Sequence, residues 1–281
     1  MIRIITDSTC EAAPAIMSHP LVTVVPLSVV FGQTSLRDGV EITREAFWQR
    51  LPTSNPLPTT SQPAPSDFAV PFEQFGSAGD EVIAITISEK LSGTYSSAMS
   101  AQETYSYWPI SVVDSQSTTI GLGLLVEEAV RMAEAGATRQ EIVERLHAMR
   151  EKIHVVFVVE TLEYLQKGGR IGKAQAFVGT LLKFKPLLAI TAGEIVPVTR
   201  VRSRAKALEA AQDHLLTQIP ARGPQVHLAL THALVEAEAQ ALGNKLAAAF
   251  ETAGFYVADL GPVLGVHTGP GTIGIGVYAG D

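Results

Sequence analysis

Three segments of the chain place hydroxyl side chains directly after short apolar runs that have the composition of core strands. In a parallel α/β sheet, ligands bind outside the carboxyl ends of the strands, so these segments would meet at one edge of the sheet. Ser92, Gly93 and Thr94 also precede an expected helix, whose free backbone N–H groups attract anions. The clustering indicates an anion site, although each residue alone could equally be an ordinary helix cap. The segments are Thr6-Asp7-Ser8-Thr9, residues 88–95, and Asp114-Ser115-Gln116-Ser117-Thr118.

His267 lies in a glycine-rich segment, residues 265–271, that we expect to form a loop. Glycines permit close backbone approach to a ligand, so His267 is a candidate binding residue, with a solvated loop histidine as the alternative. Too few residues follow the Gly-x-Gly-x-x-Gly match that begins at Gly269 for a phosphate-binding helix, so we expect no dinucleotide site. The other histidines lack the spacing of metal ligands, and the sequence predicts neither a metal nor a cofactor.

Short β-branched and apolar runs alternate with segments of helical periodicity, which is the pattern of an α/β fold. We expect two domains, residues 1–152 with a doubly wound, mostly parallel sheet and residues 153–281 with an α/β fold around a mixed sheet. In the first domain, strands are expected at 3–6, 24–31, 82–87 and 110–113, and helices at 43–51, 92–107, 121–135 and 138–151. In the second, strands are expected at 155–159, 187–191, 194–198, 226–230, 256–260 and 272–277, and helices at 175–182, 205–218 and 236–253.

Residues 52–71 are dense in proline and hydroxyl side chains, so we expect no regular helix or central strand there. Long ordered loops in compact domains are usually functional, and we favour this interpretation over a disordered linker. Thr60 and Ser61 belong to this loop.

The composition favours a protein that remains in the cytoplasm. The chain has 281 residues, of which 46% are hydrophobic and 17% charged, enough for one large core or two modest ones. Its apolar runs are far shorter than the roughly 20 residues of a membrane helix. The first residues reach Asp7 too soon for a secretory signal, and the single cysteine, Cys10, agrees with a reducing compartment.

The net charge of −7 argues against nucleic-acid binding, but the charge is distributed unevenly. Residues 164–208 carry nine lysines and arginines against one acid, Glu194, which gives a local charge of +8. Alternation along a strand would place Arg200 and Arg202 on one face, with Ser203 capping the next helix. This segment is either a docking surface for phosphate or an acidic partner, or a solvated basic face.

Six short motifs follow one another along essentially the whole chain. They are Thr6-Asp7-Ser8, Arg37-Asp38-Gly39, Thr60-Ser61-Gln62-Pro63, Leu91-Ser92-Gly93-Thr94-Tyr95, Gly168-Gly169-Arg170-Ile171 and His267-Thr268-Gly269-Pro270-Gly271. Together they closely resemble the motifs of the DegV family, whose members bind long-chain fatty acids such as palmitate between two α/β domains. In bacteria such proteins can serve as the carrier subunit of a fatty acid kinase. The resemblance implies a buried interdomain lipid site and an ATP-dependent partner kinase, with no catalytic activity of this chain alone, and it allows peripheral membrane contact during lipid exchange.

The resemblance also assigns roles to individual residues. The carboxylate would be bound by Thr60, Ser61, Ser92, Gly93 and Thr94, with His267 contributing from the second domain and Arg170 balancing the charge. Such a set of donors agrees with the need to offset the lost hydration of a carboxylate in an apolar cleft. The motifs leave the hydrocarbon chain unplaced. We expect it beside the apolar run that contains Phe177, Leu181, Leu182 and Leu188, unless this run is plain core, and we expect Arg200 and Arg202 to meet the kinase.

Two other functions remain open at the level of the sequence. Ser92, His267 and either Asp7 or Asp114 could form the triad of a serine hydrolase, but no Gly-x-Ser-x-Gly motif surrounds Ser92. A binding protein for another small anion would use the same hydroxyl groups. We therefore expect a carrier of fatty acids, with a hydrolase or a small-anion binder as the alternatives.

Overall fold

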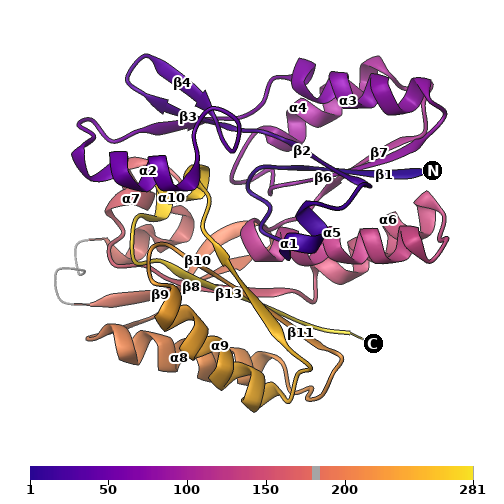
Figure 1. Cartoon of the computed structure of the whole chain (residues 1–281). Coiled ribbons are helices and arrows are strands. Elements are labelled where there is room, and N and C mark those ends of the chain that lie inside the picture. The colour runs from indigo at the N-terminus through magenta and orange to yellow at the C-terminus, as the bar shows by residue number, and fades with distance from the viewer. Residues whose placement is uncertain (179–183, 281) are drawn as a thin grey trace.

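Helices and sheets alternate in layers, in the order helix, sheet, helix, sheet, helix (Figure 1). The computed structural model describes residues 1–178 and 184–280. Every strand of the first large sheet lies at or before Asp114, and every strand of the second lies at or after His154. The predicted two-domain α/β fold is confirmed. The predicted boundary at residues 152 and 153 stays a prediction, and it falls between helix α6 (Arg139–Arg150) and strand β8 (His154–Val158).

The first large sheet has four parallel strands in the order β2-β1-β6-β7. These are β1 (Ile2–Asp7), β2 (Val22–Val25), β6 (Glu81–Thr86) and β7 (Ile110–Asp114). Helices α3 (Pro65–Ser77) and α4 (Thr94–Thr104) cover one face, α5 (Thr119–Glu134) and α6 cover the other, and the short α1 (Pro14–Met17) follows β1. After β1 the chain passes over one face of the sheet, and after β6 it passes over the opposite face. Their carboxyl ends therefore form the switch point at which such folds bind ligands.

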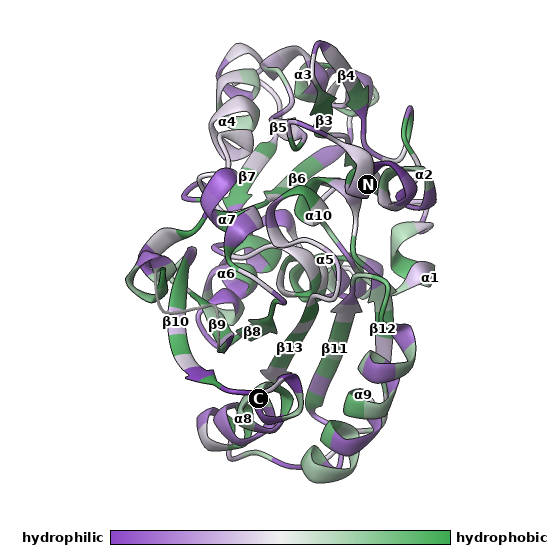
Figure 2. Cartoon of the chain, turned by 90° about the vertical axis from the view of Figure 1, so that its left-hand side faces the viewer, coloured by the Kyte–Doolittle hydropathy of each residue, from purple (hydrophilic) through white to green (hydrophobic). Residues whose placement is uncertain are grey.

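The second large sheet is mixed, as predicted, with six strands in the order β10-β9-β8-β13-β11-β12. Strands β11 and β12 pair in parallel, and the other neighbours pair antiparallel. Apolar residues run along β8, β13 and β11, and α8 and α9 cover the outer face of the sheet (Figure 2). The remaining elements are β9 (Lys185–Thr191), β10 (Glu194–Val201), β11 (Val226–His232), β12 (Phe255–Asp259), β13 (Ile273–Ala279), α7 (Glu163–Lys167), α8 (Arg204–Gln218), α9 (Glu236–Phe250) and α10 (Pro262–Thr268).

A small antiparallel sheet, in the order β4-β3-β5, corrects the prediction of one strand over residues 24–31. The chain ends β2 at Val25 and begins β3 at Ser28, with Pro26 between them. Proline has no N–H group for a sheet ladder, so the chain changes sheets there. Its strands are β3 (Ser28–Phe31), β4 (Thr34–Arg37) and β5 (Thr59–Ser61). Helix α2 (Arg44–Arg50) and a 3₁₀ helix at Leu51–Thr53 lie between β4 and β5 along the chain.

The prediction that residues 52–71 contain no helix is wrong. Helix α3 begins at Pro65, in the first turn, where the missing N–H group of proline has no partner to lose. Phe68 and Phe72, one helical turn apart, are fully buried against the sheet and hold the helix on both sides of Pro71. The predicted helix at 175–182 is also corrected, because Gly172–Phe177 is a 3₁₀ helix and residues 179–183 lie outside the described part of the chain.

Helix α5 lies between the two large sheets and contacts both (Figure 1). Its first half, residues 119–126, is buried on every side. A helix that is apolar all round needs apolar partners all round, and the two sheets supply them. The two domains therefore share α5 as part of their buried interface, and separating them would expose this helix to water.

Glu11, in the loop after β1, connects the first domain to α10. Its side chain is buried, Oε1 accepts a hydrogen bond from Gly261 N at 2.7 Å, and its backbone oxygen accepts one from the Tyr256 hydroxyl at 3.1 Å. Gly261 is the N-cap of α10, and a helix N-terminus favours a nearby carboxylate. Burial nevertheless dominates, because it raises the pKa of Glu11 from 4.5 to about 7, and it also raises the pKa of the neighbouring Asp38 to about 6.

Replacing Glu11 by glutamine should change how the free energy of unfolding depends on pH. A carboxyl group whose pKa is raised by folding stabilises the folded state below its unfolded pKa, and this contribution is lost as the pH rises through its folded pKa. Glu11 should therefore lower the stability of the parent protein between about pH 4.5 and about pH 7, whereas glutamine does not ionise. Urea unfolding near pH 5 and near pH 8 should show the Glu11→Gln variant gaining about 2–3 kcal/mol on the parent.

The control is Glu45→Gln, which removes the same charge from an exposed position on α2. Its difference from the parent should stay nearly constant over this pH range. An equally constant difference for Glu11→Gln would mean that the carboxyl group of Glu11 is solvated in the folded protein.

Candidate functional site

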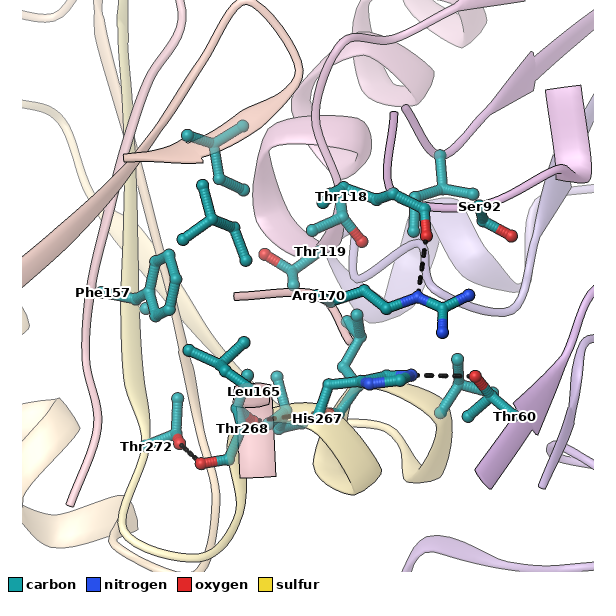
Figure 3. Close-up of a pocket in the computed structure, with 18 of the residues that line it drawn as sticks. Thr60, Ser92, Thr118, Thr119, Phe157, Leu165, Arg170, His267, Thr268 and Thr272 are labelled. Atoms are coloured by element: carbon teal, nitrogen blue, oxygen red, sulfur yellow. Dashed lines mark hydrogen bonds between the residues drawn. The ribbon is translucent and has the colours of Figure 1, made fainter. Parts of the chain in front are cut away.

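A cavity of about 360 Å³ lies between the two domains, beside the carboxyl ends of β1 and β6 (Figure 3). Residues of β8, β9, β10, β11 and β13 line one wall, and residues of β5 and α10 line another. The apolar lining is Leu27, Ile87, Leu91, Val155, Phe157, Leu165, Ile190, Ile195, Leu260, Val263 and Leu264. The polar lining is Thr60, Ser61, Gln62, Ser92, Thr118, Thr119, Arg170, Thr231, His267, Thr268 and Thr272. Such a mixture of apolar walls and a few polar groups is typical of small-molecule sites.

Asp7 joins the ends of β1 and β6 and does not line the cavity. Its Oδ1 accepts hydrogen bonds from Thr9 N at 2.9 Å and from the Thr9 hydroxyl at 2.6 Å, and its Oδ2 accepts one from Ile87 N at 2.7 Å. The side chain is fully buried, and burial raises the pKa of Asp7. This carboxylate therefore fixes the geometry of the switch point, and its oxygens are already engaged within the protein.

His267 is in the last turn of α10, so the prediction that it lies in a loop is wrong. The helix begins at Pro262, which is well suited to the first turn, and the loop starts only at Gly269. His267 Nε2 lies 2.8 Å from Thr60 Oγ1 of β5, so this hydrogen bond joins the two domains. Burial, together with the positive charge of Arg170, lowers the pKa of His267 to about 4. The imidazole is therefore neutral at neutral pH.

The segment Gly168-Gly169-Arg170 ends α7 and turns Arg170 toward the cavity. Arg170 N donates to Leu165 O and Gly169 N donates to Gln166 O, which together form a Schellman motif. Gly169 has φ 71°, the left-handed value that this motif requires. The Arg170 side chain then donates from Nε to Leu91 O at 3.3 Å and from Nη1 to Gly168 O at 2.9 Å. The ending of α7 thus positions Arg170, which is the only arginine among the described residues that line the cavity.

The motifs around Thr60 and Ser92 pack against each other. Gln62 Nε2 donates to Gly93 O at 3.2 Å and to Ser97 Oγ at 3.1 Å. Gly93 has an ordinary backbone conformation, but a Cβ there would lie 2.1 Å from Gln62 Oε1, so a larger residue would displace the Gln62 amide. The Ser92 hydroxyl lies 2.8 Å from Thr94 Oγ1, and Thr94, buried at the start of α4, holds it in place. Helix α4 begins at Thr94, two residues later than predicted.

Most residues predicted to bind the carboxylate gather on one side of the cavity. Figure 3 shows Thr60, Ser92, Arg170 and His267 together, with Phe157 on the opposite side. Ser61 also lines the cavity, whereas Gly93 and Thr94 support Ser92 from behind. Thr118 and Thr119 line the cavity as well. Thr118 ends one of the three hydroxyl segments expected at the anion site, whereas the sequence did not point to Thr119. They begin α5, and their hydroxyls have no hydrogen-bond partner among the described residues.

The apolar wall differs from the run of residues that the sequence suggested. Leu188 is buried in the cluster beside Phe157, Phe177 packs against the same cluster, and neither lines the cavity. Leu181 and Leu182 lie outside the described residues. Alternation along β8 could have identified part of the wall, because Val155 and Phe157 face the cavity whereas Val156 and Val158 face the core under α8 and α9.

Much of the predicted basic segment is neutralised by neighbouring acids. Lys167 pairs with Glu163 at 2.6 Å, and Lys173 pairs with Glu194 at 2.8 Å. Arg204 pairs with both Glu160 and Glu238, each at 2.6 Å. Arg200 and Arg202 are exposed at the end of β10, and the Arg200 guanidinium lies 5.6 Å from the ring centroids of Phe177 and Phe184. Ser203 caps α8 as predicted, because its side chain accepts a hydrogen bond from Lys206 N.

Neither a metal centre nor a membrane span is evident over residues 1–178 and 184–280. In these ranges, no three His, Cys, Asp or Glu side chains are grouped so that they could hold a metal ion. No helix there is both long enough and apolar enough to cross a membrane.

Comparison with known proteins identifies the family over the whole chain. Residues 1–280 match the family described as "Uncharacterised protein, DegV family". Protein DegV of Bacillus subtilis is 34% identical over 275 residues, which are 98% of each chain. A structure described as fatty acid binding of a DegV family protein from Thermus thermophilus has a TM-score of 0.93 and 35% identity over 99% of each chain. A stearic acid-binding protein from Eubacterium ventriosum has a TM-score of 0.90 and 31% identity, over 99% of this chain and 98% of that chain. The present chain belongs to the DegV family.

Proposed function

We propose that this chain binds a long-chain fatty acid in the cavity between its two domains. The observation that carries the proposal is the lining of the cavity, with hydrogen-bond donors and Arg170 on one side and Phe157 on the other. The similar proteins from Thermus thermophilus and Eubacterium ventriosum are described as binding fatty acids. Their likeness to this chain supports the same class of ligand here.

The polar side of the cavity suits a carboxylate. Arg170 contributes a positive charge, Thr60 and Ser92 contribute hydroxyl groups, and none of the described lining residues is Asp or Glu. A carboxylate that leaves water needs such groups to offset its lost hydration. The neutral ring of His267 completes the set with a hydrogen bond in place of a charge.

The apolar side suits a hydrocarbon chain. Phe157, Leu165, Ile190 and Leu264 come from different elements and converge on one cavity. Each methylene group buried against such a wall contributes roughly 0.8 kcal/mol, so a long acyl chain would supply most of the affinity. A small anion would use the polar side and leave this apolar surface without a partner.

The geometry does not favour a serine hydrolase. His267 is hydrogen-bonded to Thr60, Ser92 is paired with Thr94, and Asp7 is occupied by Thr9 and Ile87. A histidine with a pKa of about 4 is also a weak general base near neutral pH. Asp114, the other acid considered, accepts hydrogen bonds at Oδ1 from Gln116 N and Glu89 N. None of these hydrogen bonds joins Ser92, His267 and an aspartate, and we keep the carrier function.

We further propose that the bound carboxylate is presented, in the cytoplasm, to a partner kinase that forms the acyl phosphate. Arg170 is exposed and Ser92 and Thr60 are half-buried, so the polar side of the cavity lies close to the surface. A second protein could reach the carboxylate there while the hydrocarbon chain stayed buried. Arg200 and Arg202 are exposed at the edge of the second sheet and are our candidates for the docking surface.

The first test of this function is to identify the ligand directly. Denaturing extraction of the purified protein, followed by mass spectrometry, should release a fatty acid, because a buried acyl chain should dissociate slowly enough to survive purification. Recovery of only water-soluble metabolites from several preparations would contradict the proposal and favour a small-anion binder.

Replacing Ser92 by alanine should weaken fatty acid binding by about 1–3 kcal/mol, the usual cost of leaving a charged acceptor without one of its donors. Displacement of a fluorescent fatty acid measures this change. Ser100→Ala, which alters an exposed serine on the following helix, α4, is the control and should bind like the parent. Equal affinities for the two variants would remove Ser92 from the site.

Reversing the charge of Arg202 with Arg202→Glu should slow acyl-phosphate formation by the cognate kinase and ATP, and it should leave acyl affinity nearly unchanged. The salt dependence of transfer should also weaken, because a favourable charge contact is lost. Lys245→Glu makes the same change in net charge on the exposed side of α9, near the opposite edge of the sheet, and should leave transfer intact. Equal loss of binding and transfer in Arg202→Glu would argue against docking at this surface.

A further inference from the structure

A second cavity, of about 320 Å³, adjoins the first, and two residues line both of them. These residues are Val155 of β8 and Ile190 of β9, which lie directly opposite each other in the antiparallel ladder. Residues directly opposite in such a pair project from the same face of the sheet and touch. The partition between the two cavities therefore includes one cross-strand pair of aliphatic side chains.

The position of Val155 along β8 places the pair further from Arg170 than Phe157. The carboxyl end of β8 leads into the segment that carries Arg170. Along β8, Phe157 is therefore nearer to this segment, and Val155 is two residues further away from it. Two residues of a strand span roughly 7 Å. An acyl chain that starts at Arg170 and passes Phe157 would thus reach the pair with a later part of its hydrocarbon chain.

Helix α5 holds Val155 in place from behind. A Cβ at Gly121 of α5 would lie 2.7 Å from Val155 Cγ2, so this glycine makes the space that Val155 occupies. Val155 also belongs to a buried cluster with Ile120, against which Ile190 packs. The partition is therefore supported by the core shared between the domains and does not depend on a surface loop.

The second cavity differs in chemistry from the first. Its lining includes Gln116, Arg150, Glu151 and His154, and Arg150 Nη1 donates a hydrogen bond to Asp114 O at 2.8 Å. Methylene groups that passed the partition would meet Ile153 and then polar side chains. Their burial there would be less favourable than in the first cavity.

We propose that Val155 and Ile190 determine the maximum length of the acyl chain by closing the first cavity against the second. The proposal rests on the fatty acid function proposed above. Both side chains touch the ligand in this account, and shortening either one joins the two cavities. In such a variant, longer acyl chains can bury methylene groups for which the parent protein has no room.

The test compares fatty acids of increasing length in displacement of a fluorescent analogue from the parent, Val155→Ala and Ile190→Ala. Each additional buried methylene changes the dissociation constant about fourfold. Lengthening the chain by two methylenes beyond the parent's optimum should therefore favour the variants by up to about sixteenfold relative to the parent. The control is Val156→Ala, which removes the same atoms from the next residue of β8 on the opposite, helix-covered face.

Each outcome decides the proposal. A shift toward longer chains in Val155→Ala or Ile190→Ala, absent from Val156→Ala, supports it, and either variant suffices if the other fails to fold. An unchanged preference in a folded variant overturns it while leaving fatty acid binding intact. A parent protein that binds no fatty acid of any length contradicts the proposed function itself, and the length limit falls with it.

Discussion

The burial of α5 between two sheets is the constraint on which the rest of the structure depends. Because residues 119–126 have no polar face, the two domains must pack on opposite sides of the same helix. That packing brings the carboxyl ends of β1 and β6 against the inner face of the second sheet. The cavity is the space that remains where the N-terminus of α5 ends the shared core. The site is therefore a consequence of how the domains join, and neither domain contains it alone.

Close packing between motifs from different parts of the chain completes the site. The space left by Gly93 is filled by Gln62, and a Cβ at Gly168 would lie 2.2 Å from His267 Nδ1. Each glycine thus brings together two motifs that are far apart in the sequence. Substituting either glycine would displace a polar group of the cavity before it altered any backbone conformation, since neither has a positive φ. In these motifs the missing side chain of glycine lets a side chain from another motif approach closely. The backbone flexibility of glycine would not explain this role.

Local patterns in the sequence were enough to predict the two sheets but not the wall of the cavity. The strands expected at 187–191 and 194–198 form the hairpin of β9 and β10, whose Ala192-Gly193 turn, with φ 47° and 82°, depends on neighbouring residues alone. His267 was misplaced because Gly265 looked like part of a loop, whereas it lies in α10, where a Cβ would meet the ring of Phe47 at 2.5 Å. The pairing of Val155 with Ile190 depends on strand register across the sheet, which no local pattern shows. Of the four residues gathered at the polar side, Ser92 and His267 were candidates from local pattern, whereas Thr60 and Arg170 were assigned a role through the family resemblance. The role of all four in binding stays a prediction.

Burial has opposite electrostatic effects at the two ends of α10. It raises the pKa of Glu11 at the N-terminus and lowers that of His267 in the last turn, so each group favours its neutral form. Hydrogen bonds in such a poorly solvated environment are stronger than in water, and an unpaired charge there is costly. A carboxylate that arrived beside Arg170 would pair with a charge that is already present at the surface side. The groups on the polar side of the cavity therefore constrain the head group of any ligand. The aliphatic residues at the other end can differ without altering those groups, and such a difference would alter the length of acyl chain that fits.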